Sequence, residues 1–412
     1  MCLPAFWTPL SRSMTDKTPA TSTVNTGHGR PSAPRLAIFG IFIAFIAVFL
    51  LLILFLPKHE GELSPNERRI LAKSPDTSFS SIMDGSFSKQ FETWLQDHFP
   101  LRTGFVSLYS YINRYTGRNA VENVILGDGN RLFSAPIEYN EANIETNIDK
   151  LSRFIDKNSL NAYTYLIPTS ASMLESELPK LHLEYHDDAI INRFSEALSA
   201  KAECIPVREL FGNYSDPSAL YYRTDHHITM QGSYLSYVEI AKRLGLTPLP
   251  ESEFEKASYD FYGTAYGQSG LFALPCDTLE TWVGPYDEDL SVVTVDGSEE
   301  TLHQGSLDKD CLKEDVVDKY AAYLYSNHGI TRIENPTVPD GKLLVLKDSF
   351  GNAIVPFLAA HYNTIIMIDT RSLYYSPSMP TPSELCEQYG IDDFVVITGL
   401  DTVAEGTLDW LR

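Results

Sequence analysis

Two polar segments far apart in the chain carry the residue types of acyl-transfer chemistry. One is RTDHHIT, residues 223–229, and the other is KDSFGN, residues 347–352. A serine hydroxyl is a poor nucleophile unless a base takes its proton, and that base needs an acid to orient it. Asp225 and His227 stand two residues apart, so an extended loop points both side chains the same way. These residues are therefore candidates for a Ser349–His227–Asp225 arrangement.

The same residues have other interpretations, which the spacing leaves open. Ser349 suits the N-cap of a helix, and RTDHHIT suits an exposed loop capped by Asp225. Asp225, His226 and His227 also resemble a metal-binding cluster. A metal-dependent phosphoesterase with an Asp-His-His motif needs upstream carboxylates at Asp-x-Asp spacing, which DDAIINR (187–193) does not supply. We therefore expect no metal ligands and no cofactor.

The elements around Ser349 suggest how it is positioned. An apolar strand is predicted at 343–346, and a helix begins almost directly after Ser349. In α/β sheets, ligands bind at the carboxyl ends of strands, and the free N–H groups of a helix N-terminus stabilise an oxyanion. Further apolar strands alternate with helices along 141–245 and 342–412, which predicts a mainly parallel sheet covered on both faces. Residues 250–335 look like an insertion over this core.

An apolar run near the N-terminus predicts one membrane-spanning helix. Residues 36–56 form 21 consecutive uncharged residues, LAIFGIFIAFIAVFLLLILFL. As a helix they extend about 31 Å, the thickness of a hydrocarbon core. The run is too long for a signal-peptide core and no cleavage site follows. Basic residues before it place residues 1–35 in the cytoplasm and the C-terminal part outside. The Ser, Thr and Pro content of 1–35 predicts a disordered tail. We expect a helical stalk at 57–120 and the main domain at 121–412.

Charge divides at this helix. The chain carries 32 Lys and Arg against 54 Asp and Glu, a net charge of −22. Residues 1–57 hold four basic residues and one acidic residue, a balance of +3, so the remainder carries −25. Such a surface argues against nucleic acid as a partner.

Four cysteines follow the apolar run, at 204, 276, 311 and 386. Their spacing chooses neither a disulfide connectivity nor free thiols.

Several segments together resemble the DHHW protein family, which is similar to the SGNH-hydrolase-like alginate O-acetyltransferases. The resemblance covers most of 60–412. It rests on RTDHHIT followed about 120 residues later by KDSFGNAIVPFLAAHYNTIIMIDTR, and on matching pieces elsewhere. These pieces are SPNERRILAKSPDTSFSSIMDGSFSKQFETWLQDHFPLR, NVILGDGNRLF, IPTSASMLESELP, FYGTAYGQSG and DKYAAYLYSNHGITRIENP. The resemblance implies an SGNH-hydrolase-like α/β fold preceded by one transmembrane helix.

The resemblance also implies roles for individual residues. Carried over, the catalytic acid is Asp225, the base is His227 and the nucleophile is Ser349. The family's arginine falls on Arg371, a candidate for binding an acyl or anionic group; a salt bridge to a core carboxylate is the alternative. We expect oxyanion or substrate contacts from Asn352, the Ser349 N–H and His226.

Two positions depart from the family pattern. Ile228 stands where a tryptophan usually follows the two histidines, which puts substrate contact in doubt. Lys347 precedes Asp348 and Ser349 where related turns have glycine. Its ammonium group either attracts an anionic donor or solvates the turn.

The resemblance implies a membrane-anchored O-acetyltransferase or acetylesterase acting on a cell-envelope glycan. A multi-span membrane acyltransferase is the implied partner, because acetyl donors are cytoplasmic. The alternative is a non-catalytic glycan-binding or scaffolding subunit of a cell-surface polysaccharide system. The acidic surface disfavours a strongly anionic polymer unless Lys347, Arg223 and Arg371 form a basic pocket. It favours a neutral or amino-sugar glycan.

Overall fold

The chain forms two compact units, residues 1–57 and residues 58–412. In a computed structural model, the described residues are 33–64, 66–67, 69–121, 123–371, 379–409 and 411. Helix α1 (Ala33–Phe55) accounts for the described part of the first unit and has no buried residue. Its length and composition suit a membrane span. Residues 1–32 of the expected cytoplasmic tail lie outside the described residues.

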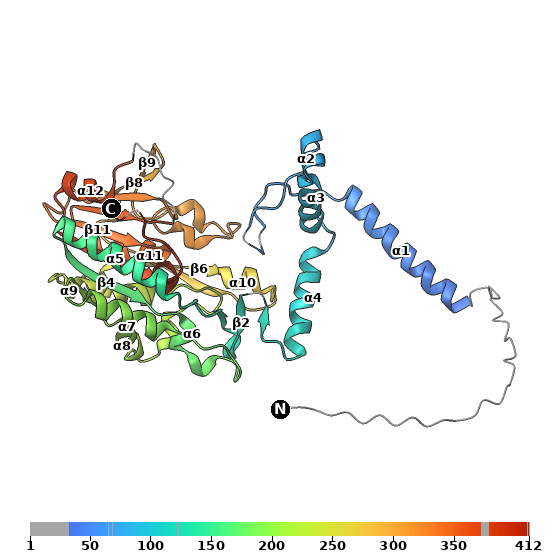
Figure 1. Cartoon of the computed structure of the whole chain (residues 1–412), viewed down its shortest axis with the longest axis horizontal. Helices are drawn as coiled ribbons and strands as arrows, with labels where there is room; N and C mark the ends of the chain where they lie inside the picture. Colours follow the sequence, from blue (N-terminus) through green and yellow to red (C-terminus); the bar gives the residue numbers. More distant parts are fainter. Residues whose placement is uncertain are drawn as a thin grey trace, which may run out of the picture. The chain divides into compact units, whose positions relative to one another are not determined.

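The second unit is built on an eight-stranded sheet in the order β5-β4-β13-β11-β12-β10-β8-β9. Figure 1 shows this sheet with helices packed around it. The first five strands are parallel, which confirms the predicted sheet. They are β5 (Ala202–Cys204), β4 (Asn161–Ile167), β13 (Asp393–Gly399), β11 (Lys342–Lys347) and β12 (Thr364–Ile368). The last three strands are antiparallel. They are β10 (Ile330–Glu334), β8 (Ser291–Asp296) and β9 (Glu299–Gln304).

Helices cover both faces of this sheet because each central strand is apolar on both sides. Alternate residues of β11 enter two different cores: Leu343 and Val345 pack on one face, and Leu344 and Leu346 on the other. The first core contains α8 (Val207–Gly212), α9 (Met230–Arg243) and α11 (Ser349–Leu358). The second contains α5 (Glu141–Asn158), α7 (Asp187–Leu198), α12 (Pro382–Tyr389) and α13 (Leu400–Ala404).

Residues 250–335 do more than cover the core. They supply β8, β9 and β10, which extend the main sheet, and a separate ladder of β6 (Glu255–Phe261) with β7 (Asp277–Val283). The sequence indicates short strands in this segment without strong periodicity; β6 and β9 are exposed along most of their length, whereas β8 and β10 are largely buried. An exposed strand lacks the apolar alternation on which the prediction depends.

Shorter elements lie at the edges of the second unit. Residues 57–120 contain three helices, α2 (Phe79–Met83), α3 (Ser86–Asp97) and α4 (Arg102–Tyr115). Helix α4 contacts the main body, since the Tyr111 hydroxyl accepts the Ala273 N–H at 3.2 Å. The other short elements are β1 (Ala120–Val121), β2 (Val124–Leu126), β3 (Leu132–Ser134), α6 (Ser170–Met173), η3 (Pro217–Leu220), α10 (Thr264–Ser269) and η7 (Lys319–Ala322). Cys204, Cys276, Cys311 and Cys386 are free thiols.

Candidate active site

Ser349 begins α11 directly after the central strand β11. The preceding Asp348 is the N-cap, and its Oδ1 accepts the Phe350 N–H at 3.0 Å. Its Oδ2 accepts the Gly399 N–H at 2.6 Å and the Thr402 hydroxyl at 3.0 Å, which ties the turn to the end of β13. Because Asp348 caps the helix, the N-cap interpretation of Ser349 is wrong. The Ser349 hydroxyl is thus available for another contact.

A closed turn presents Asp225 and His227. Tyr221 and Ile228 pair as an antiparallel bridge, and the Tyr222 N–H donates to the His227 carbonyl at 3.2 Å. Asp277 anchors the turn from outside, because its Oδ2 accepts the Thr224 N–H and hydroxyl, both at 2.7 Å. These bonds fix the backbone between the bridged ends, so the turn is ordered rather than an exposed loop.

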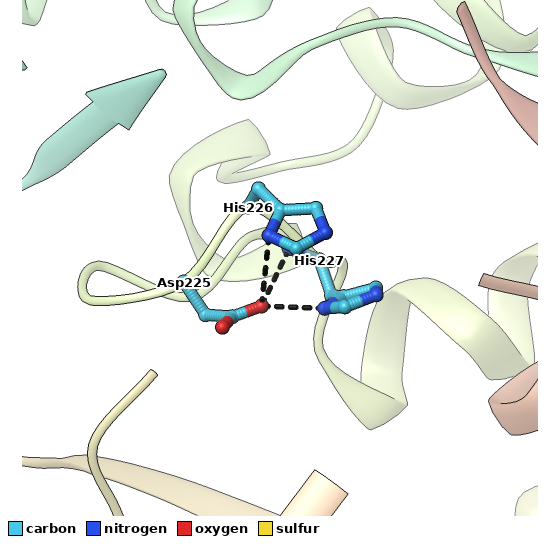
Figure 2. A group of neighbouring side chains, drawn as sticks. All are labelled: Asp225, His226 and His227. Atoms are coloured by element: carbon cyan, nitrogen blue, oxygen red, sulfur yellow. Dashed lines mark hydrogen bonds and ion pairs between the residues drawn. The ribbon is translucent and has the colours of Figure 1, made fainter. Parts of the chain in front are cut away.

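Hydrogen bonds link the three residues from the two distant segments. His227 Nδ1 lies 2.5 Å from Asp225 Oδ1, and His227 Nε2 lies 2.7 Å from Ser349 Oγ. Figure 2 shows the Asp225 carboxylate facing both histidine rings. A carboxylate only accepts hydrogen bonds, so Nδ1 carries the proton and Nε2 is free to accept from the serine hydroxyl. The imidazole is thus in the tautomer that a general base requires.

The Asp225 carboxylate is buried and fully hydrogen-bonded. Oδ1 also accepts the His227 N–H at 3.0 Å, and Oδ2 accepts the Thr264 N–H at 2.6 Å. Burial acts to raise the pKa of Asp225, but attraction to His227 and His226 and these hydrogen bonds outweigh it. The pKa of Asp225 is consequently held well below its usual range, so the group stays ionised at neutral pH.

Aromatic rings enclose His227 on several sides. The Tyr320 ring stacks on it with centroids 3.9 Å apart, and Phe350 meets it edge-on at 4.9 Å. The Tyr320 hydroxyl also donates to the Ser349 carbonyl at 3.2 Å. Sequence reasoning did not select Tyr320. The available signal was its segment, DKYAAYLYSNHGITRIENP, which carries part of the family resemblance.

The segment after Tyr320 is strained and holds the start of α11. Leu324, Tyr325 and Ser326 have φ values of 49°, 62° and 82°, a left-handed conformation that costs energy for residues other than glycine. The Asn352 amide donates to the Ser326 carbonyl at 3.1 Å and to Asn327 Oδ1 at 3.0 Å. Both of its N–H groups are therefore engaged, so the structure does not support the expected donation by Asn352 to an oxyanion.

Lys347 and Arg371 converge on one buried carboxylate. Lys347 Nζ lies 3.3 Å from Asp369 Oδ2, and Arg371 contacts both Asp369 oxygens at 2.8 and 3.0 Å. The Lys347 side chain is 1% exposed, and burial lowers its pKa. The Lys347 ammonium group is enclosed beneath the turn, so it neither faces an anionic donor nor solvates the turn. Both roles expected for Lys347 are therefore wrong. Arg371 forms a salt bridge with the buried Asp369 carboxylate, which was the alternative to binding an acyl or anionic group.

His226 and Asp225 also raise the question of a metal ion, since the ligand atoms of Asp225, His226 and His227 lie within 4.8 Å of one another. Ligands of tetrahedral zinc stand ~3.3 Å apart. The 2.5 Å between His227 Nδ1 and Asp225 Oδ1 is a hydrogen-bond distance, and His227 Nε2 is directed to Ser349. The arrangement fits a hydrogen-bonded base better than a metal centre.

Ile228 does not face the site. Its side chain is 1% exposed and belongs to the hydrophobic core with Tyr221 and Met230. The departure from tryptophan at this position thus concerns packing beneath the turn.

A pocket of about 390 Å³ opens beside this site. His226 and Phe350 contribute to its wall, and residues that follow β4 and β13 line it at the carboxyl ends of these strands. The His226 side chain is 39% exposed, and its ring lies tilted against the His227 ring with centroids 3.9 Å apart. This volume is within the range of small-molecule sites.

Comparison with known proteins gives a family and a fold. The sequence profile described as DHHW protein matches residues 155–368, just over half of the chain. No curated protein sequence matches significantly. A DHHW family protein from Eubacterium siraeum is similar in structure, with a TM-score of 0.56 and 19% identity over 68% of this chain and 91% of that one.

Two further structures are of Bacillus cereus PatB1, one of them with a sulfonyl adduct. The adduct structure has a TM-score of 0.58 and 22% identity, covering 69% of this chain and 97% of that one. The adduct-free structure has a TM-score of 0.57, also at 22% identity, covering 68% and 97%. At these identities the likeness shows the fold alone, which is the α/β fold that the sequence predicted.

Proposed function

The chain belongs to the DHHW protein family, and we propose that it is an SGNH-hydrolase-like O-acyltransferase or esterase acting on a cell-envelope glycan. The observation that carries this proposal is the continuous hydrogen-bond chain from Asp225 through His227 to Ser349, at 2.5 and 2.7 Å. Nucleophile, base and orienting acid are all within the reach that acyl transfer needs.

The first half-reaction forms an acyl-enzyme. Ser349 Oγ attacks the carbonyl carbon of an ester donor while its proton passes to His227 Nε2. The tetrahedral intermediate collapses as the donor's alcohol leaves with that proton. Asp225 keeps the imidazole in register and stabilises the imidazolium, and its low pKa keeps it anionic.

The oxyanion formed in each half-reaction needs hydrogen-bond donors. The Ser349 N–H is the first N–H of α11 and makes no hydrogen bond within the described part of the chain. It lies at the positive end of the helix dipole, next to the attacking oxygen. This group is the oxyanion donor in the proposal, in place of the Asn352 amide.

The second half-reaction transfers the acyl group to a glycan hydroxyl, or to water in an esterase. His227 takes the acceptor's proton, the acceptor oxygen attacks the acyl carbon, and the proton returns to Ser349 Oγ. In this proposal α1 anchors the enzyme with the second unit outside the membrane, where the glycan lies. The acyl donor arrives from a multi-span membrane partner.

The serine can be tested by hydrolysis of 4-nitrophenyl acetate with the full chain in detergent. Ser349→Ala should lower kcat/KM by about 10³-fold or more, and His227→Ala by a similar factor, because the residues act as a unit. Ser199→Ala, at an exposed serine after α7, is the matched control and should keep wild-type activity. Equal hydrolysis by wild type and Ser349→Ala would sink the assignment and favour the non-catalytic glycan-binding alternative.

A further inference from the structure

The charge of the pocket beside Ser349 bears on which glycan can enter it. Two carboxylates, Asp401 and Glu405, line this pocket, and its described lining contains no lysine or arginine. Arg371 is engaged by both oxygens of Asp369 and is not part of the lining. Asp401 also interacts electrostatically with Arg371, but no cation in the described lining offsets the like charge that an anionic sugar would meet in this pocket.

Asp401 is the carboxylate available to a ligand. Asp401 is the second residue of α13, two positions after the end of β13, and it is exposed. Its side chain forms no ion pair within the described residues, whereas Glu405 Oε1 already accepts the Glu138 N–H at 2.7 Å. Asp401 lies in the first turn of α13 and Glu405 is the C-cap residue four positions later, so both side chains project from one side of this short helix.

The rest of the lining suits a carbohydrate. Hydroxyl and amide groups alternate with short apolar side chains, and the His226 ring offers a further polar edge. The polar members are Asn123, Ser134, Thr169, Ser170, Thr264 and Gln268. Neutral groups of this kind donate to and accept from sugar hydroxyls without a net charge.

A second pocket, which Tyr266 of α10 helps to line, is also rich in carboxylates. It is lined by Tyr259, Tyr262 and Tyr266 together with Asp260 and two further carboxylates, Glu314 and Asp315. The Tyr262 and Tyr266 rings lie 4.4 Å apart, and Tyr262 is 40% exposed. The one lysine in this lining, Lys319, is buried and donates to backbone carbonyls. This second pocket is therefore acidic as well.

We propose that the acceptor is a glycan with free amino groups, whose ammonium binds Asp401 while a neighbouring hydroxyl faces His227. This inference rests on the proposed function and names its substrate class. It follows from the position of the exposed Asp401 carboxylate in the pocket whose wall includes His226 and Phe350. Sugars carrying a carboxylate are disfavoured by the same group.

The pairing has a chemical consequence for the product. An amine is a stronger nucleophile than a hydroxyl, but only when it is unprotonated. An ammonium held against Asp401 keeps its proton, so the acyl carbon is attacked by the hydroxyl oxygen. The C–O bond to Ser349 breaks, a new ester C–O bond forms, and the hydroxyl proton passes through His227 to Ser349 Oγ. The product is an O-acyl amino sugar.

The test compares acceptors with the full chain in detergent and 4-nitrophenyl acetate as donor. The acceptors are pentamers of glucosamine, N-acetylglucosamine and galacturonic acid. We expect KM for the glucosamine pentamer to be about tenfold below that for the N-acetylated one, with the uronate poorest. Asp401→Asn should raise the KM for the glucosamine pentamer about tenfold. The KM values for the glucosamine and N-acetylglucosamine pentamers should then be equal. Glu387→Gln, an exposed carboxylate on α12 that does not line this pocket, should leave this ratio unchanged.

The outcomes separate the two proposals. A normal release of 4-nitrophenolate with equal KM for glucosamine and N-acetylglucosamine would overturn the acceptor assignment alone. A preference that survives Asp401→Asn would also overturn it. No acyl-enzyme formation at all would overturn the proposed function on which it rests. A shift of the product from O-acetyl to N-acetyl in Asp401→Asn would support the role of the carboxylate directly.

Discussion

Tyr320 contacts two of the three residues in the hydrogen-bond chain. Its ring stacks on His227 and its hydroxyl donates to the carbonyl of Ser349. A single side chain thereby sets the plane of the base and the position of the nucleophile's backbone. Its role in the proposed reaction is positioning, because it acts through these residues.

Replacing Tyr320 separates these two contacts. Tyr320→Phe keeps the stacked ring and loses the hydrogen bond, so kcat should fall about threefold to tenfold. Tyr320→Ala removes both, and kcat should fall further while KM changes little. The kcat and KM of both variants for 4-nitrophenyl acetate check this. Equal kcat in Tyr320→Phe and Tyr320→Ala would show that stacking does not position His227.

The raised pKa of the buried Asp348 carboxyl predicts that the stability of the second unit depends on pH. Burial raises the pKa of this carboxyl to about 6, against the lowering by Arg371. The folded state therefore binds the proton more tightly than the unfolded state does. The contribution of Asp348 to the free energy of unfolding falls as pH rises from about 4 to about 6.

Asp348→Asn should remove this pH dependence. It also places an amide N–H against the Gly399 N–H, which lowers stability by about 1–3 kcal/mol. We expect melting temperatures to show a larger gap between wild type and variant at pH 4.5 than at pH 7.5. A gap that widens with rising pH would contradict the assigned shift.

Residue types were predictable from the sequence where chemistry itself demands them. Ser349, His227 and Asp225 were selected because a weak nucleophile needs a base and the base needs an acid. The environments of Lys347 and Asn352 were not predictable. Lys347 contacts Asp369 and Asn327, and Asn352 donates to Asn327. Asp369 and Asn327 come from other parts of the chain. Only folding brings them together.

At the scale of elements, the Asp225 turn depends on a close approach by the segment before α10. A Cβ at Gly263 would overlap the Cβ of Asp225 and lie 2.6 Å from its Oδ2. The Thr264 N–H that donates to this carboxylate would be displaced with it. Glycine is therefore required here by the distance between two backbones.

Gly263→Ala should lower kcat for 4-nitrophenyl acetate by about tenfold or more, because the orienting acid moves away from His227. The matched control is Gly104→Ala in α4, where a Cβ meets nothing within 4 Å. This control should keep wild-type kcat. Unchanged activity in Gly263→Ala would show that the turn tolerates the shift.

The central parallel strands were predictable from their apolar sequences. The apolar β4, β11, β12 and β13 stand out in the sequence, and the parallel part of the sheet follows from them. The antiparallel extension and the 324–326 conformation depend on tertiary contacts that have no local pattern. Tyr320 was missed for the same reason.

At the scale of the whole molecule, the chain separates into an apolar helix and a compact acidic body. The two units divide at residue 57, and α1 has no buried residue. If α1 is the membrane anchor of the proposed enzyme, it contributes little to the stability of the second unit.

Removal of residues 1–57 should therefore release the protein from membranes without unfolding it. We expect the full chain to stay in the membrane fraction after alkaline carbonate washing and the shortened chain to be soluble. Their melting temperatures should agree within about 3 °C. A shortened chain that aggregates or melts far lower would show that α1 belongs to the folded body.

The central claim is that Ser349 is a nucleophile activated by His227. A sulfonyl fluoride tests it most directly, because it forms a stable adduct with a serine hydroxyl that is activated as a nucleophile. After treatment with phenylmethanesulfonyl fluoride, mass spectrometry of the digested full chain should find one sulfonyl group on Ser349 in wild type and in Ser199→Ala. Labelling should be lost in Ser349→Ala and strongly slowed in His227→Ala. An unmodified Ser349 in the wild-type protein, or equal labelling with and without His227, would contradict the account.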